Sequence, residues 1–157
     1  MRIEYTEASM SSEKFFEDYS IGESRKTPGR TITEADVVLH AGQTGDYYPH
    51  HTDEAWCQSQ PLGHRIAHGT LSFAIAAGLK SREINFRSMT YGYERVRFPH
   101  PVYFGDTVHV VTTITDKRPH PKKAGFGIVT EHTELRNQRD EVVLACDHLH
   151  FVECRNA

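Results

Sequence analysis

The chain has 157 residues, of which 38% are hydrophobic and 25% are charged, and its formal net charge at pH 7 is −3. This length and composition predict one globular domain, residues 1–157, and exclude an intrinsically disordered protein. They also exclude general nucleic-acid binding, because the longest basic cluster, at residues 117–123, is short and interrupted by prolines.

The cysteines and the N-terminus indicate where the protein resides. Cys57, Cys146 and Cys154 are an odd number without a C-x-x-C spacing, so neither a disulfide framework nor a zinc knuckle is indicated. Residues 1–19 carry acids where a secretory signal needs an apolar run, and no segment approaches the roughly 18 apolar residues that span a bilayer. We therefore expect a cytoplasmic protein that binds no membrane, with residues 1–13 poorly ordered.

The first predicted helix follows a region of aromatic and turn residues, 15–33, that leaves room for one early strand. Thr33 is a good N-cap, because its hydroxyl can accept a hydrogen bond from the amide of Asp36, whose carboxylate favours the positive end of the helix dipole. A helix over about residues 34–43 follows, and Gly45 ends it.

Two further helices are predicted before the middle of the chain. The sequence TDEAWCQSQ, residues 52–60, can form a short helix with Thr52 or Asp53 as its cap. The sequence IAHGTLSFAIAAGLKSR, residues 66–82, predicts a longer helix whose middle is apolar on nearly every side. Such a helix must be buried on most sides, so another part of the protein has to wrap it.

The second half predicts the wrapping sheet. Four segments are rich in Val, Thr, Ile and aromatic residues and are separated by turns that contain Pro or Gly: 89–98, 106–118, 125–138 and 141–154. Residues 137–141 are a predicted hairpin turn. The fold class is therefore α+β, with one long helix cradled by a curved antiparallel sheet. The edges of this sheet need protection, which favours a homodimer or a higher homo-oligomer.

The short sequence GDYYPHH, residues 45–51, offers a pair of groups for proton transfer. Asp46 and His51 lie five residues apart, and Pro49 between them stiffens the loop. A carboxylate and an imidazole held on a rigid loop can share the work of moving protons to and from a small molecule or water. The alternative is an ordinary polar turn.

Gly69, in the sequence IAHGTL, is placed at or just before the first turn of the long helix. The backbone amides there have no partners within the helix, and the positive end of the helix dipole points outward. A glycine lets a ligand carbonyl approach closely, and the amide can then stabilise negative charge on that oxygen. The alternative is a glycine with a purely structural role.

Together these segments resemble a known family. The sequences GDYYPHHTDEAW and GHRIAHGTLSFAIAAGL resemble the signature of the MaoC-like hydratase/dehydratases, which reads G-D-x-N-P-aliphatic-H-x-D and then A/V-H-G. The segment RFPHPVYFGDTV is similar to the P-V-x-x-G-D segment of that family, and the resemblance extends from about Thr33 to the C-terminus. It implies a hot-dog fold, a long helix wrapped by an antiparallel sheet, which is usually dimeric with the thioester site near the subunit interface.

The resemblance also implies an activity and a set of site residues. The chain is expected to be an enoyl-CoA hydratase or 3-hydroxyacyl-CoA dehydratase, with Asp46 and His51 as the catalytic pair and the Gly69 amide polarising the thioester carbonyl. It places four further residues at the substrate: Tyr48, Pro49, Ala67 and His68. No cofactor and no metal are required.

Two positions depart from the family pattern. Tyr48 stands where the family has asparagine, and a phenol is larger and has a single hydroxyl, so it either reshapes the pocket or marks a branch whose chemistry has changed. His50 stands where the family has an aliphatic residue, and we interpret it as a structural neighbour that tunes the polarity of the site.

The remaining histidines allow a metal only in one place. His64 and His68 are four residues apart but form no H-E-x-x-H motif. His148 and His150 point to the same face of a strand, where they either bind a metal or face solvent. We expect no metal site.

Two alternative functions stay open. A hot-dog thioesterase would use Asp46 to activate water against the thioester carbonyl, and a non-catalytic partner subunit would bind an acyl thioester without turnover. The expected ligand is in each case an acyl-CoA or acyl-carrier-protein thioester. Four arginines are candidates for the phosphates of coenzyme A: Arg65, Arg82, Arg95 and Arg97.

Overall fold

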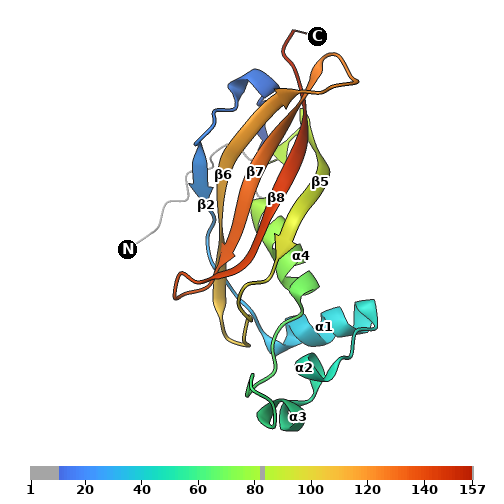
Figure 1. Ribbon diagram of the computed structural model, residues 1–157, viewed down its shortest axis with the longest axis vertical. Coiled ribbons are helices and arrows are strands. Elements are labelled where there is room, and N and C mark those ends of the chain that lie inside the picture. Colours follow the sequence, from blue (N-terminus) through green and yellow to red (C-terminus); the bar gives the residue numbers. More distant parts are fainter. Residues whose placement is uncertain (1–10, 82–83, 157) are drawn as a thin grey trace.

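The computed structural model describes residues 11–81 and 84–156 (Figure 1). The predicted disorder of the N-terminus falls, up to residue 10, outside the described residues. The helices are a 3-10 turn η1 (Phe16–Asp18), α1 (Glu34–Thr44), α2 (Pro49–Thr52), α3 (Glu54–Gln58) and α4 (Gly69–Lys80). The strands are β1 (Ser11–Ser12), β2 (Ser24–Lys26), β3 (Arg30–Thr31), β4 (Ile84–Asn85), β5 (Ser88–Arg97), β6 (Thr107–Pro119), β7 (Phe126–Arg136) and β8 (Val142–Glu153).

The large sheet has the strand order β2-β6-β7-β8-β5, and β3 also pairs with β6. All of these pairs are antiparallel, as the sequence predicts. The predicted hairpin turn between β7 and β8 is present, since the Asn137 amide donates to the Glu141 carbonyl at 3.0 Å. Asp140 in this turn has a φ of 62°, a left-handed conformation that aspartate tolerates. β5 lies at one end of the strand order.

α4 lies against the curved sheet, and α1, α2 and α3 gather beyond its lower end (Figure 1). α4 begins at Gly69 rather than Ile66, because the backbone before it is extended and paired with another segment. Ile66 forms a bridge with Tyr103, and the Ala67 amide donates to the Val102 carbonyl at 2.8 Å. Because this pairing keeps the backbone before Gly69 extended, the helix begins at Gly69, and its first amides, which have no acceptors within the helix, lie there. No helix in the described part of the chain is long and apolar enough to cross a membrane.

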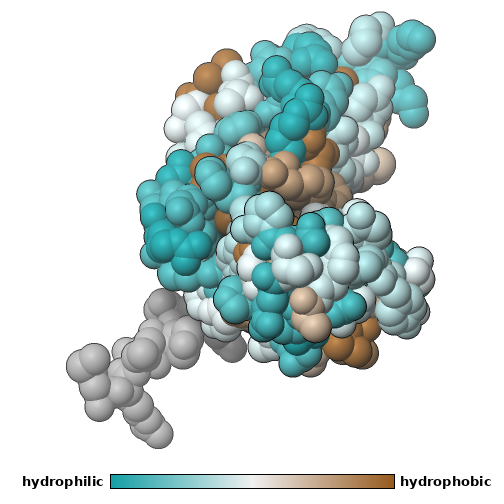
Figure 2. Space-filling view, turned by 60° about the horizontal axis from the view of Figure 1, so that its bottom comes forward, coloured by the Kyte–Doolittle hydropathy of each residue, from teal (hydrophilic) through white to brown (hydrophobic). Residues whose placement is uncertain are grey.

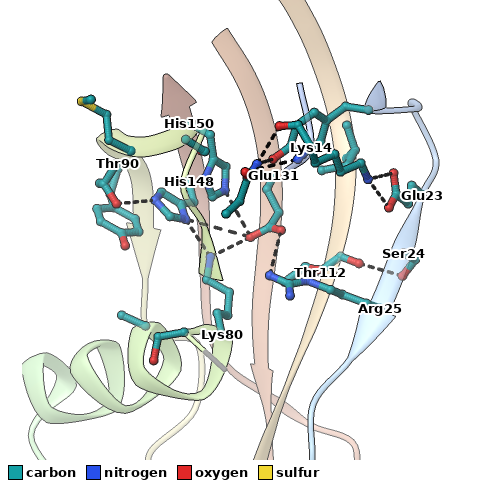
Figure 3. Close-up of a pocket in the computed structure, with 18 residues that line it drawn as sticks. Lys14, Glu23, Ser24, Arg25, Lys80, Thr90, Thr112, Glu131, His148 and His150 are labelled. Carbon is teal, nitrogen blue, oxygen red and sulfur yellow. Dashed lines mark hydrogen bonds and ion pairs between the residues drawn. The ribbon is translucent and has the colours of Figure 1, made fainter. Parts of the chain in front are cut away.

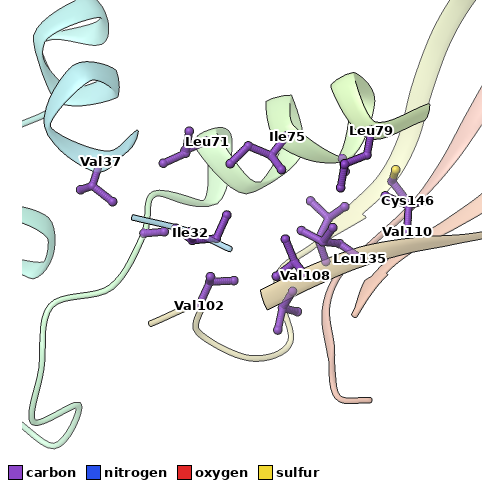
Figure 4. Packing of buried hydrophobic residues seen from close by; sticks show 14 residues of the cluster. Ile32, Val37, Leu71, Ile75, Leu79, Val102, Val108, Val110, Leu135 and Cys146 are labelled. Carbon is purple, nitrogen blue, oxygen red and sulfur yellow. The ribbon is translucent and has the colours of Figure 1, made fainter. Parts of the chain in front are cut away.

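The core forms where α4 meets the sheet (Figure 4). Leu71, Ile75 and Leu79 recur at every fourth position and share one buried face of α4. They belong to one apolar cluster with β6 and β7 residues that include Val108, Val110 and Leu135. The opposite face, Thr70, Ala74 and Gly78, is exposed. The prediction that the helix is buried on most sides is therefore confirmed, since six of its 12 residues are buried and only this narrow stripe is exposed.

The ends of α1 place the loop that follows it. The Thr33 hydroxyl accepts from the Asp36 amide at 3.4 Å, and the Asp36 carboxylate accepts from the Thr33 amide at 2.9 Å. This is a capping box, and it confirms the predicted start of the helix. Gly45 ends α1 in the left-handed conformation with a φ of 76°, which confirms the predicted stop. Asp46 therefore lies at the start of the next segment.

The segment predicted as a stiff loop is partly helical. α2 is a single turn with Pro49 at its first position, where the missing amide hydrogen of proline costs nothing. Tyr48 before it is extended, as expected for a residue that precedes proline. Asp53 then caps α3, since its carboxylate accepts from the Trp56 amide at 2.8 Å. His51 therefore lies on a short helix between Pro49, at its first position, and Asp53, which caps the next helix.

Candidate active site

Asp46 begins the candidate site directly after α1. Its carboxylate accepts a hydrogen bond from the Tyr48 amide at 3.2 Å, which is the turn typical of aspartate two residues before its donor. The Asp46 side chain is exposed. The turn holds its backbone and one carboxylate oxygen in a fixed relation to the start of α2.

Two main-chain groups of the segment before α4 fix the position of His51. The Ile66 amide donates to the His50 carbonyl at 3.0 Å, and the Ile66 carbonyl lies 2.8 Å from Nδ1 of His51. Because a carbonyl oxygen can only accept, Nδ1 carries the hydrogen and Nε2 of the neutral ring carries the lone pair. Burial lowers the pKa of His51 below 6.5, against the opposing effect of this hydrogen bond. The ring is thus a neutral base near pH 7.

Three side chains converge at this point. One carboxylate oxygen of Asp46 and one ring nitrogen each of His51 and His68 lie within 4.8 Å of one another. The rings of His51 and His68 stack, with centroids 3.7 Å apart and planes inclined by 26°. Metal binding needs nitrogen lone pairs that converge in the ring planes, whereas stacked rings hold theirs nearly side by side. The arrangement suits proton transfer better than chelation.

A mostly apolar cavity of about 330 Å³ opens beside His51. Its lining residues include His51 and Gly69, and its apolar walls include Leu62, Phe98 and Val102. Asp46 does not line the cavity, but one of its carboxylate oxygens lies within 4.8 Å of a ring nitrogen of His51, which does line it. The predicted trio is therefore brought together, but only two of its members line the cavity among the described residues.

Gly69 begins α4 at the wall of this cavity. A Cβ atom at this position would lie 3.1 Å from the ring of Phe98, so a side chain here would force that ring to move. The first amides of a helix have no acceptors within it, and the positive dipole end lies at the same place. Gly69 therefore places a backbone amide that has no acceptor within the helix at the wall of the cavity.

The other predicted substrate residues divide into two groups. Ala67 lines the cavity. Tyr48, Pro49 and His68 do not line it among the described residues. Tyr48 is 56% exposed and stacks on His50, with ring centroids 4.8 Å apart. The phenol is therefore not part of the cavity wall.

A second polar cluster lies in a cavity of about 460 Å³ between the C-terminal end of α4 and the sheet (Figure 3). His148 and His150 point to the same face of β8, as predicted, and both line this cavity with Glu131 of β7. His148 is buried rather than turned to solvent. Neither Glu131 nor Lys80 was expected here, since nothing in the local sequence marks either residue as buried.

Lys80 occupies the place that a metal would take. Its ammonium group donates to Glu131 at 2.7 Å, to Nδ1 of His148 at 2.9 Å and to Thr133 at 3.0 Å. Nε2 of His148 therefore carries the hydrogen and donates to Thr90 at 3.0 Å. The cluster has the ligand types of a Glu-His-His metal site, but the lysine already supplies the cation.

The pKa values of this cluster follow from burial and charge. Burial alone would raise the pKa of Glu131, but the hydrogen bond from His150 and the charge of Lys80 outweigh it and lower the pKa well below 4.5. Burial, followed by the charges of His150 and Lys80, lowers the pKa of His148 to about 3. A carboxylate, an ammonium and a neutral imidazole thus persist in the interior at neutral pH.

The arginines proposed for the coenzyme A phosphates have other partners. Arg65 pairs with Glu34 at 2.7 Å and with Glu54 at 3.5 Å. Arg95 pairs with the buried carboxylate of Asp147. Arg97 donates to the neighbouring Val96 carbonyl, and Arg82 lies outside the described residues. The geometry therefore favours none of the three described arginines.

Comparison with known proteins gives a consistent set of relatives. The model of the MaoC like domain family matches residues 16–135. Protein MaoC of Klebsiella aerogenes is 38% identical over 105 residues, which are 66% of this chain and 31% of that protein. The (R)-specific enoyl-CoA hydratase of Rhodospirillum rubrum is 33% identical over 112 residues, which are 71% of this chain and 77% of that protein. The chain thus spans about a third of the first relative and most of the second.

A solved structure from Mycobacterium tuberculosis, described as a double hot-dog fold, superposes with a TM-score of 0.76 at 21% identity. The match covers 91% of this chain and 45% of that one. A likeness at this identity concerns the fold alone, and it confirms the hot-dog arrangement of α4 and the antiparallel sheet.

Proposed function

Since this chain belongs to the MaoC-like domain family, we propose that it is a hydro-lyase that adds water to an enoyl thioester or removes it from the 3-hydroxyacyl thioester. The observation that carries this proposal is the setting of His51. Its Nδ1–H is held by the Ile66 carbonyl, so its Nε2 lone pair is available beside Asp46. The same ring and the Gly69 amide line one apolar cavity.

The mechanism begins with polarisation of the substrate. The thioester carbonyl lies against the Gly69 amide at the start of α4, where the helix dipole adds to the field. Electron density moves toward that oxygen, so the β-carbon becomes electrophilic and the enolate-like charge is stabilised. The apolar walls exclude bulk water and strengthen both effects.

Asp46 and His51 then position the water molecule and transfer its protons. Asp46 orients the water molecule, and Nε2 of His51 takes one of its protons as the oxygen bonds to the β-carbon. The pair returns a proton to the α-carbon, so the elements of one water are added across the double bond. Dehydration follows the same steps in reverse.

Enoyl thioesters are the direct test of this proposal. We expect loss of the conjugated-thioester absorbance when crotonyl-, longer-chain, branched or dicarboxylic enoyl-CoA is added, with a 3-hydroxyacyl-CoA as product. The (R)-specific enoyl-CoA hydratase among the relatives supports coenzyme A as the thiol. Matched acyl-carrier-protein thioesters test the other carrier. Release of free thiol without hydration would replace the proposal with thioester hydrolysis, and tight binding without turnover would replace it with a binding subunit.

We also propose that the chain acts as a homodimer joined along β5. In the described part of the chain β5 has β8 on one side and no strand on the other. Large exposed apolar side chains lie on it or beside its ends: Phe86, Met89, Tyr91 and Phe98. Figure 2 shows one face of the molecule, which is mostly hydrophilic and has separated hydrophobic areas. An apolar edge strand is a preferred site of pairing between chains.

The dimer is tested by mass and by one added charge. Sedimentation equilibrium is expected to give twice the chain mass of 17.9 kDa. Met89→Glu is expected to shift the protein toward monomer, because a buried carboxylate would face the partner. Ile21→Glu is the matched control, since Ile21 is 65% exposed and Met89 62% exposed, but Ile21 lies away from β5. A wild-type monomer, or equal effects of the two substitutions, would contradict the proposal.

Two further proposals concern the setting of the enzyme. We propose that residues 1–157 form one domain, which is supported by the large apolar cluster that α4 shares with the sheet. We propose a cytoplasmic location, which is supported by the free thiols of Cys57, Cys146 and Cys154.

A further inference from the structure

His68 is the buried side chain nearest to the catalytic pair. It is 1% exposed, and its ring lies between those of His40 and His51, with centroid distances of 4.9 Å and 3.7 Å. His68 is the N-cap residue of α4, but its side chain makes no capping hydrogen bond. A buried imidazole normally has a hydrogen-bond partner, and for His68 this partner is not a backbone amide of α4.

The partner of His68 is the main chain of Asp46. Nε2 of His68 lies 2.9 Å from the Asp46 carbonyl oxygen, 22 residues earlier in the sequence. Since the carbonyl only accepts, Nε2 carries the hydrogen, and Nδ1 of the neutral ring carries a lone pair. Nδ1 is buried and has no hydrogen-bond partner among the described residues. The ring therefore makes a hydrogen bond to Asp46 through Nε2 and leaves Nδ1 without one.

The two contacts of His68 connect the elements of the proposed site. Its hydrogen bond ties the loop after α1 to the start of α4, and its flat face supports the ring of His51 on α2. Gly69 is the next residue along the chain. The His68 side chain thus contacts the backbone of Asp46 and the ring of His51, and His68 directly precedes the Gly69 amide.

We propose that His68 is a positioning residue that holds Asp46 and His51 in register with the Gly69 amide, without touching the substrate itself. This assignment rests on the proposed function, and it replaces the expectation that His68 binds substrate. A displacement of about 1 Å at a reacting group is sufficient to cost roughly 100-fold in rate. A face-to-face imidazole also limits how far His51 can tilt while it gains and loses a proton.

Two substitutions separate the two contacts. His68→Gln keeps an N–H donor at the distance of Nε2 but removes the ring, and His68→Phe keeps a ring but removes the donor. His64→Gln is the matched control, because His64 belongs to the same HRIAH segment and its exposed side chain is hydrogen-bonded to Glu54. Thermal unfolding of each variant measures whether the fold is retained.

The kinetic result expected is a loss in kcat with little change in KM. Each His68 variant is expected to lower kcat by about 10- to 100-fold and to leave KM within about threefold, because transition-state geometry is affected and substrate contacts are not. The His64→Gln variant is expected to match the wild type. Unchanged kcat in both His68 variants would overturn the proposal, and so would losses that merely follow a lowered melting temperature.

NMR titration of the His51 ring gives a readout that does not need activity. The charged or titratable side chains that act on His51 are Asp46, which raises its pKa, and His68 and His50, which lower it. Both variants remove the His68 imidazole, so the pKa of His51 is expected to move upward, toward 6.5, in each of them. An unchanged titration would overturn the proposal. If the wild-type protein hydrates no enoyl thioester, the proposed function fails, and this titration alone decides the role of His68.

Discussion

Replacing His51 by alanine is expected to lower the hydration rate at least about 100-fold, as is usual for the loss of a proton-transfer group. The reason is the fixed tautomer: the Ile66 carbonyl holds Nδ1–H, and this leaves Nε2 as the basic atom of a ring that lines the cavity. Asp46→Asn is expected to show a loss of similar size, because an amide keeps the turn with the Tyr48 amide but removes the charge that orients water. The measurement is the steady-state rate with the best enoyl thioester.

The pH dependence of the same reaction is a second expected result of this geometry. The active form of His51 is the neutral ring, and burial lowers its pKa below 6.5. The value of kcat/KM is therefore expected to stay flat down to pH 6.5 and to fall only at more acidic pH, as His51 becomes protonated. An acid limb above pH 6.5 would contradict this assignment of the base.

A surface histidine provides the control for these substitutions. His120 is remote from the pair, and His120→Ala is expected to leave the rate unchanged, since its ring contacts Tyr91 and Phe151 instead. Equal losses in the His120 and His51 variants would show that the rate reports folding rather than proton transfer.

Replacing Lys80 by methionine is expected to destabilise the protein by about 3–5 kcal/mol, the usual cost of removing one partner of a buried ion pair. Lys80 is 7% exposed, and its ammonium lies 2.7 Å from Glu131. Methionine has a similar length but no charge, so the Glu131 carboxylate loses its closest cation. The free energy of unfolding in urea measures the effect.

Two further variants define the origin of this loss. When Glu131 is also replaced by methionine, part of the stability is expected to return, because no charge is left buried without its partner. Arg118→Met removes an ion pair with Asp116 of the same 2.7 Å length, in which both side chains are about half exposed. Its expected effect is about 0–1 kcal/mol. Equal losses from the Lys80 and Arg118 variants would contradict the role of burial.

The same cluster predicts loss of stability in acid. The pKa of His148 is about 3 in the folded protein, against 6.5 in the unfolded chain. The unfolded chain therefore takes up a proton first, and stability falls between pH 6.5 and pH 3 by up to about 1.4 kcal/mol per pH unit from this group. The lowered pKa of Glu131 acts in the same direction below pH 4.5. His148→Gln is expected to reduce the slope.

Local signals in the sequence were sufficient for much of the fold. Thr33 and Asp36 have the spacing of a capping box, Gly45 supplies the left-handed stop, and residues 137–141 form a hairpin turn. Each of these depends on side chains a few residues apart, so sequence alone can predict it. The resemblance to the family likewise implied that Asp46, His51 and Gly69 meet at one cavity, and two of them, His51 and Gly69, line it.

Contacts between distant residues could not be predicted in this way. Lys80 is at the end of a helix, where a lysine normally reaches solvent, and its partners Glu131 and His148 are 51 and 68 residues away. The resemblance to the family implied that His68 lies at the substrate. Its burial against His51 depends on how α2 packs beside the start of α4, which no local pattern specifies.

The loop after α1 is held mainly by main-chain atoms. The carbonyls of Asp46, His50 and Ile66 accept the hydrogen bonds that connect it to α4 and to the preceding segment. The side chains of Tyr47 and Tyr48 are 63% and 56% exposed. Evolution and protein engineering can therefore vary these two positions and alter what an incoming substrate meets, while the backbone scaffold beneath them keeps its shape. A tyrosine in place of the family's asparagine is one such change.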